Sequence, residues 1–135
     1  MKALILVLIT FGFLISAQSS PKQLPVIVEV PVKPEKSTYA KIQKADKTKG
    51  YLLIETKEAA EKYFSAKDMK ALAKVDFTKR KLAIFVWSSS GRDEIQPVVK
   101  ESFPEQISFT KTRGRTRDLR QHFVVFSIRQ NAVLN

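Results

Sequence analysis

From Tyr51 to its end, the chain consists of short apolar segments separated by polar or turn-forming residues. Residues 82–87 are apolar at every position, which predicts a strand covered on both faces. Residues 105–111 alternate, with Ile107 and Phe109 on one face, and this predicts a half-exposed strand. The whole pattern predicts strands at 51–55, 82–87, 94–100, 105–111 and 121–129.

Two helix starts precede the all-apolar strand. Thr56 stands before residues 57–64, and Ser65 stands before a second segment with apolar residues at helical spacing. Both hydroxyls are suited to accept the free backbone N–H groups of a helix start. Because the helices come early and the later strands have hairpin-compatible connections, we expect an α+β domain. It should have a mainly antiparallel sheet of about five strands and two short helices near its start.

The beginning of the chain has the pattern of a signal peptide. Lys2 is followed by an apolar run over residues 3–15 and then by the small residues Ser16 and Ala17. We therefore expect residues 1–17 to be cleaved and the protein to be exported, either periplasmic or extracellular. A retained anchor is the alternative, because a spanning helix needs about 18 to 20 apolar residues. In that case the uncleaved segment would provide the membrane contact.

Residues 18–50 differ from the rest in composition. They hold four of the six prolines and are rich in lysine, without sustained hydrophobic periodicity. This composition predicts a Lys/Pro-rich linker, followed by a single folded domain over 51–135. A second interpretation stays open, in which Val26-Ile27-Val28 adds an edge strand to that domain.

Composition excludes several classes of site. The chain has no Cys and one His, so disulfides, thiol nucleophiles and Cys-type or multi-histidine metal sites are excluded within one chain. Phosphate loops and dinucleotide fingerprints are absent, and the sequence gives no reason to expect a cofactor or a metal. The formal net charge of +11 favours an anionic partner. We expect no specific nucleic acid partner, because no RNA or DNA motif is present and export argues against one.

Positive charge is concentrated in one segment near the end. Residues 111–120 carry five cations and one anion, and all arginines of the chain lie from Arg80 onward. The planar guanidinium group suits paired contacts with carboxylate, phosphate or sulfate. We expect a noncatalytic binding surface for an acidic protein face or an envelope polymer, formed by Arg92, Arg113, Arg115, Arg117 and Arg120.

Acidic residues and the single histidine stand beside these arginines. Asp93 and Asp118 each follow an arginine next to a predicted strand end, which favours a salt-bridged network between two loops, with His122 nearby. One alternative is that this network is purely structural. Another is a small hydrolase, with a serine from Ser88 to Ser90, His122 as base and Asp93 or Asp118 as orienting acid. A noncatalytic role is preferred, because the Gly-x-Ser-x-Gly elbow is missing.

One segment resembles a known family. Residues 75–87, Val-Asp-Phe-Thr-Lys-Arg-Lys-Leu-Ala-Ile-Phe-Val-Trp, precede a small-residue turn through Gly91. An Asp-Phe before a turn and an apolar strand ending in such a loop resemble the C-terminal domain of a bacterial protease-complex subunit family. The likeness covers residues 51–129, but the Pro-Thr-Gly-Gly-Tyr-like turn of that family is replaced by Ser89-Ser90-Gly91-Arg92-Asp93. The resemblance implies an exported noncatalytic domain with a protease among its candidate partners.

Overall fold

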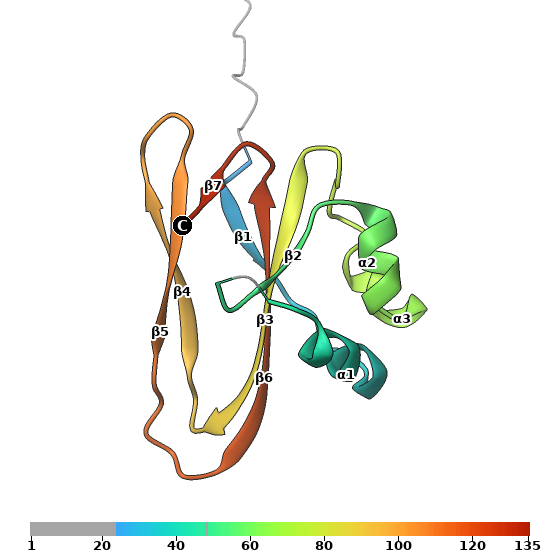
Figure 1. Cartoon of the computed structure of the whole chain (residues 1–135), viewed down its shortest axis with the longest axis vertical. Coiled ribbons are helices and arrows are strands. Elements are labelled where there is room, and N and C mark those ends of the chain that lie inside the picture. Colours follow the sequence, from blue (N-terminus) through green and yellow to red (C-terminus); the bar gives the residue numbers. More distant parts are fainter. Residues whose placement is uncertain (1–23, 48) are drawn as a thin grey trace, which may run out of the picture.

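The structure, a computed structural model, describes residues 24–47 and 49–135 (Figure 1). The predicted signal peptide, residues 1–17, lies outside the described residues. No helix in the described residues has the length and apolar character needed to cross a membrane. The elements are β1 (Ile27–Val30), α1 (Lys36–Lys44), β2 (Leu52–Ile54), α2 (Lys57–Tyr63), α3 (Ala66–Ala71), β3 (Arg80–Ser90), β4 (Glu94–Lys100), β5 (Gln106–Thr112), β6 (Leu119–Arg129) and β7 (Val133–Leu134).

The strands form two sheets rather than one. A four-stranded antiparallel sheet has the order β1-β6-β3-β2, and a three-stranded sheet has the order β4-β5-β7, in which β7 runs parallel to β5. Figure 1 shows the three-stranded sheet on one side of the four-stranded sheet and the helices on the other. The α+β class and the mainly antiparallel pairing are confirmed. The expectation of about five strands was too low, because β1 lies in the segment predicted as a linker and β7 has only two residues.

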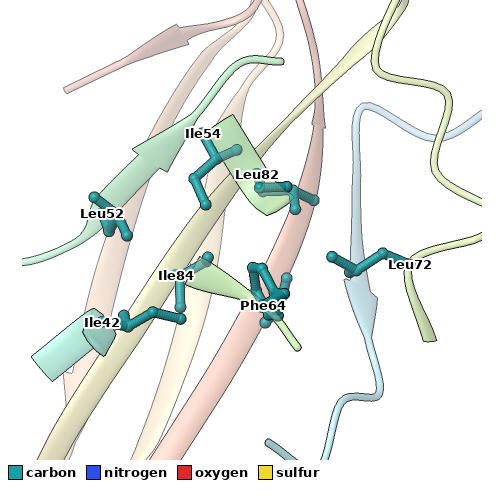
Figure 2. Close-up of a cluster of buried hydrophobic side chains, with 9 residues drawn as sticks. Ile42, Leu52, Ile54, Phe64, Leu72, Leu82 and Ile84 are labelled. Atoms are coloured by element: carbon teal, nitrogen blue, oxygen red, sulfur yellow. The ribbon is translucent and has the colours of Figure 1, made fainter. Parts of the chain in front are cut away.

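One apolar core fills the space between the four-stranded sheet and the helices (Figure 2). Leu82 and Ile84 of β3 are fully buried there, together with Ile54 of β2 and Ile42 of α1. Burying side chains of this size contributes about 1.5–3 kcal/mol each to folding. This core fixes the helices on one face of the sheet.

A second core lies between the two sheets and is rich in aromatic rings. The rings of Phe85 and Phe109 meet edge to face with centroids 4.8 Å apart, and Phe126 packs against both. Ile107 is fully buried in the same layer. β3 therefore contributes side chains to both cores, which confirms the prediction from its uninterrupted apolar run.

Both predicted helix starts are present. The Thr56 hydroxyl accepts from the Ala59 N–H at 3.2 Å, and the Ser65 hydroxyl accepts from the Asp68 N–H at 3.2 Å. α2 and α3 follow directly after these caps, as the sequence predicts. Each cap satisfies one backbone donor that the first helical turn leaves without an intrahelical partner.

The linker prediction is wrong for residues 24–47. β1 pairs with β6 over Ile27–Val30, so the open alternative of an added edge strand is confirmed. α1 buries Tyr39 and Ile42, and the Thr38 hydroxyl accepts from the backbone N–H of Ser65 at 3.1 Å. Only two apolar residues of α1, Tyr39 and Ile42, are buried, and their burial depends on a sheet formed by residues far along the chain. Local periodicity could not reveal this helix, and the folded domain begins well before Tyr51.

Candidate functional site

Two loops lie together at the end of the molecule where β3 and β5 finish, at the bottom of Figure 1. One joins β3 to β4 through Gly91, and the other joins β5 to β6 through Gly114. The Gly91 N–H donates to the carbonyl of Asp118 at 3.1 Å, and Gly91 has φ +105°, a region that L side chains rarely adopt. A Cβ on Gly114 would lie 2.2 Å from the Arg92 backbone nitrogen, so only glycine allows this approach. The two loops are therefore in backbone contact.

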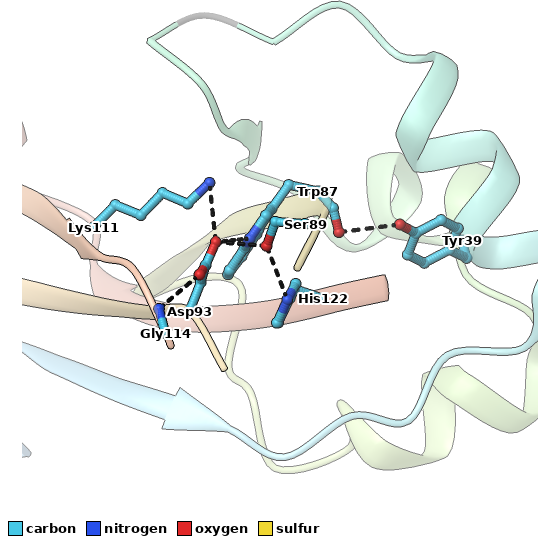
Figure 3. Close-up of polar contacts among 7 residues, drawn as sticks. All are labelled: Tyr39, Trp87, Ser89, Asp93, Lys111, Gly114 and His122. Atoms are coloured by element: carbon cyan, nitrogen blue, oxygen red, sulfur yellow. Dashed lines mark hydrogen bonds and ion pairs between the residues drawn. The ribbon is translucent and has the colours of Figure 1, made fainter. Parts of the chain in front are cut away.

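The Asp93 carboxylate holds the two loops together (Figure 3). Its side chain is 2% exposed, and it accepts from the Ser89 hydroxyl at 2.6 Å and the Gly114 N–H at 2.9 Å. It also accepts from Trp87 Nε1 at 3.1 Å, and Lys111 Nζ lies 3.7 Å away. The hydrogen bonds from Ser89 and Gly114 hold the pKa of Asp93 well below its usual range, against the opposing effect of burial. Asp93 is thus a charged clamp between the β3–β4 and β5–β6 connections.

His122 belongs to the same cluster. Its ring stacks on Trp87 with centroids 4.6 Å apart and planes 10° apart, and its Nε2 lies 3.2 Å from the Ser89 hydroxyl oxygen. Because the single Ser89 proton is directed to Asp93, His122 Nε2 donates to the Ser89 oxygen. Lys111 Nζ lies 4.9 Å from the centroid of the Trp87 ring. Stacking and hydrogen bonding give His122 a defined place on β6, on the face that the sequence predicts.

Three of the residues proposed for a hydrolase meet in this cluster, but in a different order from a catalytic triad. In a triad the imidazole lies between the hydroxyl and the carboxylate. Here the Ser89 hydroxyl lies between Asp93 and His122. Asp118, the other acid proposed for that role, pairs instead with Arg120.

The predicted network of two acids and several arginines divides into two separate parts. Within the described part of the chain, Asp93 is paired with Lys111 and with no arginine. Arg120 Nε donates to Asp118 Oδ2 at 2.9 Å, and this hydrogen bond is the main reason that the pKa of Asp118 is lowered. Both side chains of that pair are exposed to solvent. The two loops are joined through backbone groups and Asp93 rather than through the predicted reciprocal arginine–aspartate pairs.

Four of the five predicted binding arginines are exposed and have no acid of their own. Among residues 24–47 and 49–135, no ion pair or side-chain hydrogen bond engages Arg92, Arg113, Arg115 or Arg117. Arg120 differs, because Asp118 already occupies its guanidinium group. The clamped loops therefore carry four guanidinium groups whose charge the described part of the fold does not neutralise.

Sequence reasoning missed part of the clamp. Trp87 was predicted as an apolar strand residue, and its indole N–H donating to Asp93 has no local signal. The Tyr39 hydroxyl, from the segment predicted as a linker, donates to the Trp87 carbonyl at 3.3 Å. In the sequence, Lys111 is only one of the five cations of residues 111–120, and nothing there indicates its contacts with Asp93 and Trp87. These contacts join residues 6 to 48 positions apart, beyond the range of spacing arguments.

No metal site is evident, since the described residues contain no group of three or more His, Cys, Asp or Glu side chains able to hold an ion. Searches of family models, curated proteins and solved structures find no match to this chain.

Proposed function

We propose that this protein is a noncatalytic interaction module that binds an anionic partner through Arg92, Arg113, Arg115 and Arg117, which we call the loop arginines. The observation that supports the proposal is that exposed guanidinium groups without acidic partners stand on two loops held together by one buried carboxylate. Arg120 takes a smaller part, because a partner would have to compete with Asp118.

The clamp explains why such loops would favour binding. Gly91, Gly114 and Asp93 fix the backbone from which the arginines project, so less conformational entropy is lost when a partner is bound. The arginine side chains remain free to form paired contacts with carboxylate, phosphate or sulfate groups. Rigid support and unneutralised charge together suit recognition of an anion.

The partner that we propose is an acidic protein surface or an envelope polymer outside the cell. In the four-stranded sheet, β1 starts at the end opposite the β3–β4 and β5–β6 loops, as the strand register gives and Figure 1 shows. A chain attached at its beginning would therefore present the loop arginines away from the attachment. The net charge of +11 adds long-range attraction, which salt would weaken.

Retention on immobilised dextran sulfate and on immobilised polyglutamate tests the proposal. The triple variant Arg113→Ala, Arg115→Ala, Arg117→Ala should elute at clearly lower salt than the unmodified chain. The matched control is Lys57→Ala, Lys62→Ala, Lys70→Ala, which removes the same charge from exposed positions on α2 and α3. Equal losses in the two variants would mean that net charge alone, rather than the loop arginines, causes retention.

A hydrolase is the second candidate, because Ser89, His122 and Asp93 do meet. Their order argues against it, since the imidazole would have to move between the hydroxyl and the carboxylate to act as the base. A screen with p-nitrophenyl esters and glycosides compares the unmodified chain with His122→Gln and Ser89→Ala. Turnover that both variants abolish, with melting temperatures preserved, would favour the hydrolase over the binding module.

A further inference from the structure

A hollow of about 490 Å³ lies on the helix-facing side of the four-stranded sheet, between β1 and the end of α3. Its apolar lining comes from Val28, Val30 and Pro31 on one wall and from Ala71 and Val75 on the other. Val28 is 42% exposed, which is high for a valine in a sheet. The hollow thus runs beside a strand whose apolar side chains are incompletely covered.

β1 is also an edge strand, with β6 on one side and no strand on the other among the described residues. The Arg129 N–H donates to the Val26 carbonyl at 2.9 Å, and β1 continues this register with β6. In an antiparallel pair every second residue bonds to the neighbouring strand, so the backbone groups of Ile27 and Glu29 point away from β6. No hydrogen bond within residues 24–47 and 49–135 engages these groups, so they can pair with another extended chain.

A cationic hollow of about 480 Å³ adjoins the first at the beginning of β1, and the two share Leu24 and Arg80. Lys79 and Gln130 also line it. Arg80 is buried, and four of its five N–H groups donate to Pro25, Val26 and Ser127. The fifth, on Nη1, has no acceptor in the described part of the chain.

The charge of Arg80 is not balanced by an acid. No carboxylate pairs with Arg80 within residues 24–47 and 49–135, whereas the neighbouring Arg129 is paired with Glu105 at 2.9 Å. Burial, and to a lesser degree Arg129, lowers the pKa of Arg80, so its charge is in an unfavourable setting. A carboxylate in this hollow would offset that cost.

We propose that the two adjoining hollows form one groove, which binds an extended peptide with a free C-terminal carboxylate. The peptide adds antiparallel to β1, with its carboxylate at Lys79 and Arg80. Antiparallel addition places the end of the peptide beside the beginning of β1, where the cationic hollow lies. Backbone hydrogen bonds to Ile27 and Glu29 supply affinity, and the apolar hollow selects apolar side chains at alternate peptide positions. This site is separate from the loop arginines and does not depend on the function proposed for them.

The observations favour a peptide over a free amphipathic acid or a second copy of the chain. Only an extended chain uses the unpaired backbone of β1, and an acyl chain leaves those groups without partners. Lys74, Lys79 and Arg80 outnumber the one acid in the two hollows, Glu29, which favours an anionic end group. A second copy pairing through β1 would bring the two Glu29 side chains close together, with no opposite charge on that strand.

Selection from a library of random heptapeptides with free C-termini, on the full chain, tests this proposal. Enriched peptides should end in an apolar residue, and they should shift the NMR resonances of the β1 amides. The same peptides made as C-terminal carboxamides should bind at least about tenfold more weakly. Val28→Lys and Lys79→Glu should weaken binding to a similar degree. Their controls are Val98→Lys, an equally exposed valine on edge strand β4, and Lys100→Glu, which should leave binding unchanged. Arg80 is avoided because it also holds β1.

Several outcomes would overturn the proposal. These are no enrichment, equal affinity of the carboxamides, or equal losses in the control variants. If decanoate shifts the same resonances and no peptide is enriched, the ligand of the groove is an amphipathic acid rather than a peptide. If analytical ultracentrifugation shows a dimer that Val28→Lys dissociates, the occupant of the groove is a second copy of the chain.

Discussion

Arginine has opposite roles at the two ends of this molecule. At the end where β1 begins, Arg80 is buried and donates to backbone and hydroxyl oxygens, and Arg129 is paired with Glu105. At the other end, Arg113, Arg115 and Arg117 are exposed, and no acid in the described residues neutralises them. The buried guanidinium group of Arg80 holds β1 against β6, whereas the N–H groups of the loop arginines remain available to bind a partner.

The two ends also differ in what fixes the backbone. β1 is held by a cation that donates to several carbonyls, and the loops are held by an anion, Asp93, that accepts from several donors. Consequently the loop arginines contribute little to the stability of the loops that carry them. Substituting the loop arginines should therefore change binding without changing stability. Substituting Arg80 should change the stability of the fold together with any binding beside β1.

The largest effect is expected for Arg80→Leu. The variant removes charge-assisted hydrogen bonds to Ser127 and to the start of β1, and hydrogen bonds to a charged group are worth about 1.5–3 kcal/mol each. We expect the free energy of unfolding to fall by about 3 kcal/mol in urea denaturation. Arg113→Leu is the control and should change it by less than about 0.5 kcal/mol. Similar losses in the two variants would contradict the comparison.

The next largest effect is expected for Asp93→Ala. Losing this carboxylate leaves the partly buried donors of Ser89, Trp87 and Gly114 without their shared acceptor. The melting temperature should fall, and hydrogen exchange at Gly114 should accelerate. Asp118→Ala removes only an exposed pair and should leave the melting temperature nearly unchanged. A larger decrease for Asp118→Ala would show that Asp93 is not the clamp.

A smaller effect of the same clamp should appear in acid. The pKa of Asp93 in the folded protein is lowered, so the carboxylate stabilises the fold above the ordinary carboxyl pKa of about 3.9. That contribution is lost as the pH falls below this value toward the folded pKa. Urea midpoints measured from pH 7 to pH 2 should decline below pH 4, and Asp93→Ala should make the decline shallower. Parallel acid profiles would mean that Asp93 titrates alike in the folded and unfolded chain.

The smallest effect on stability is expected for the loop arginines themselves. Because no described contact of the fold depends on Arg113, Arg115 or Arg117, their triple alanine variant should melt within about 1 °C of the unmodified chain. Circular dichroism melts at low and high salt provide the measurement. A clear decrease in melting temperature would indicate internal contacts and favour a structural role for these residues.

Much of the fold follows from local sequence pattern. The uninterrupted apolar run through Phe85 predicted a strand covered on both faces, and the Thr56 and Ser65 caps predicted where α2 and α3 begin. These predictions succeed because the apolar pattern of a strand and the capping of a helix start can be read from residues only a few positions apart. α1 was missed because its stability depends on Ile42 entering a core formed by β2 and β3.

The candidate site was predictable in its residues and not in its contacts. The density of arginine in residues 111–120 indicated the charged loop, and Gly114 indicated a turn there. The pairing of Asp93 with Gly114, Trp87 and Lys111 was not predictable, since the cation beside Asp93 in the sequence is Arg92, whereas the one that it meets in the fold is Lys111. Which cation a carboxylate meets depends on strand register, which places Lys111 opposite Ile95 on the paired strand.

The sequence by itself determined the charge of this protein, its α+β class, its helix caps and the concentration of guanidinium groups near its end. Tertiary structure alone decided that Asp93 binds the two loops together, that Arg80 lies inside, and that residues 24–47 belong to the fold. The physical reason is how far apart along the chain the interacting residues stand. Charge, caps and periodicity arise within one or two turns of the chain, whereas neutralisation and burial depend on neighbours that only the folded sheets bring together.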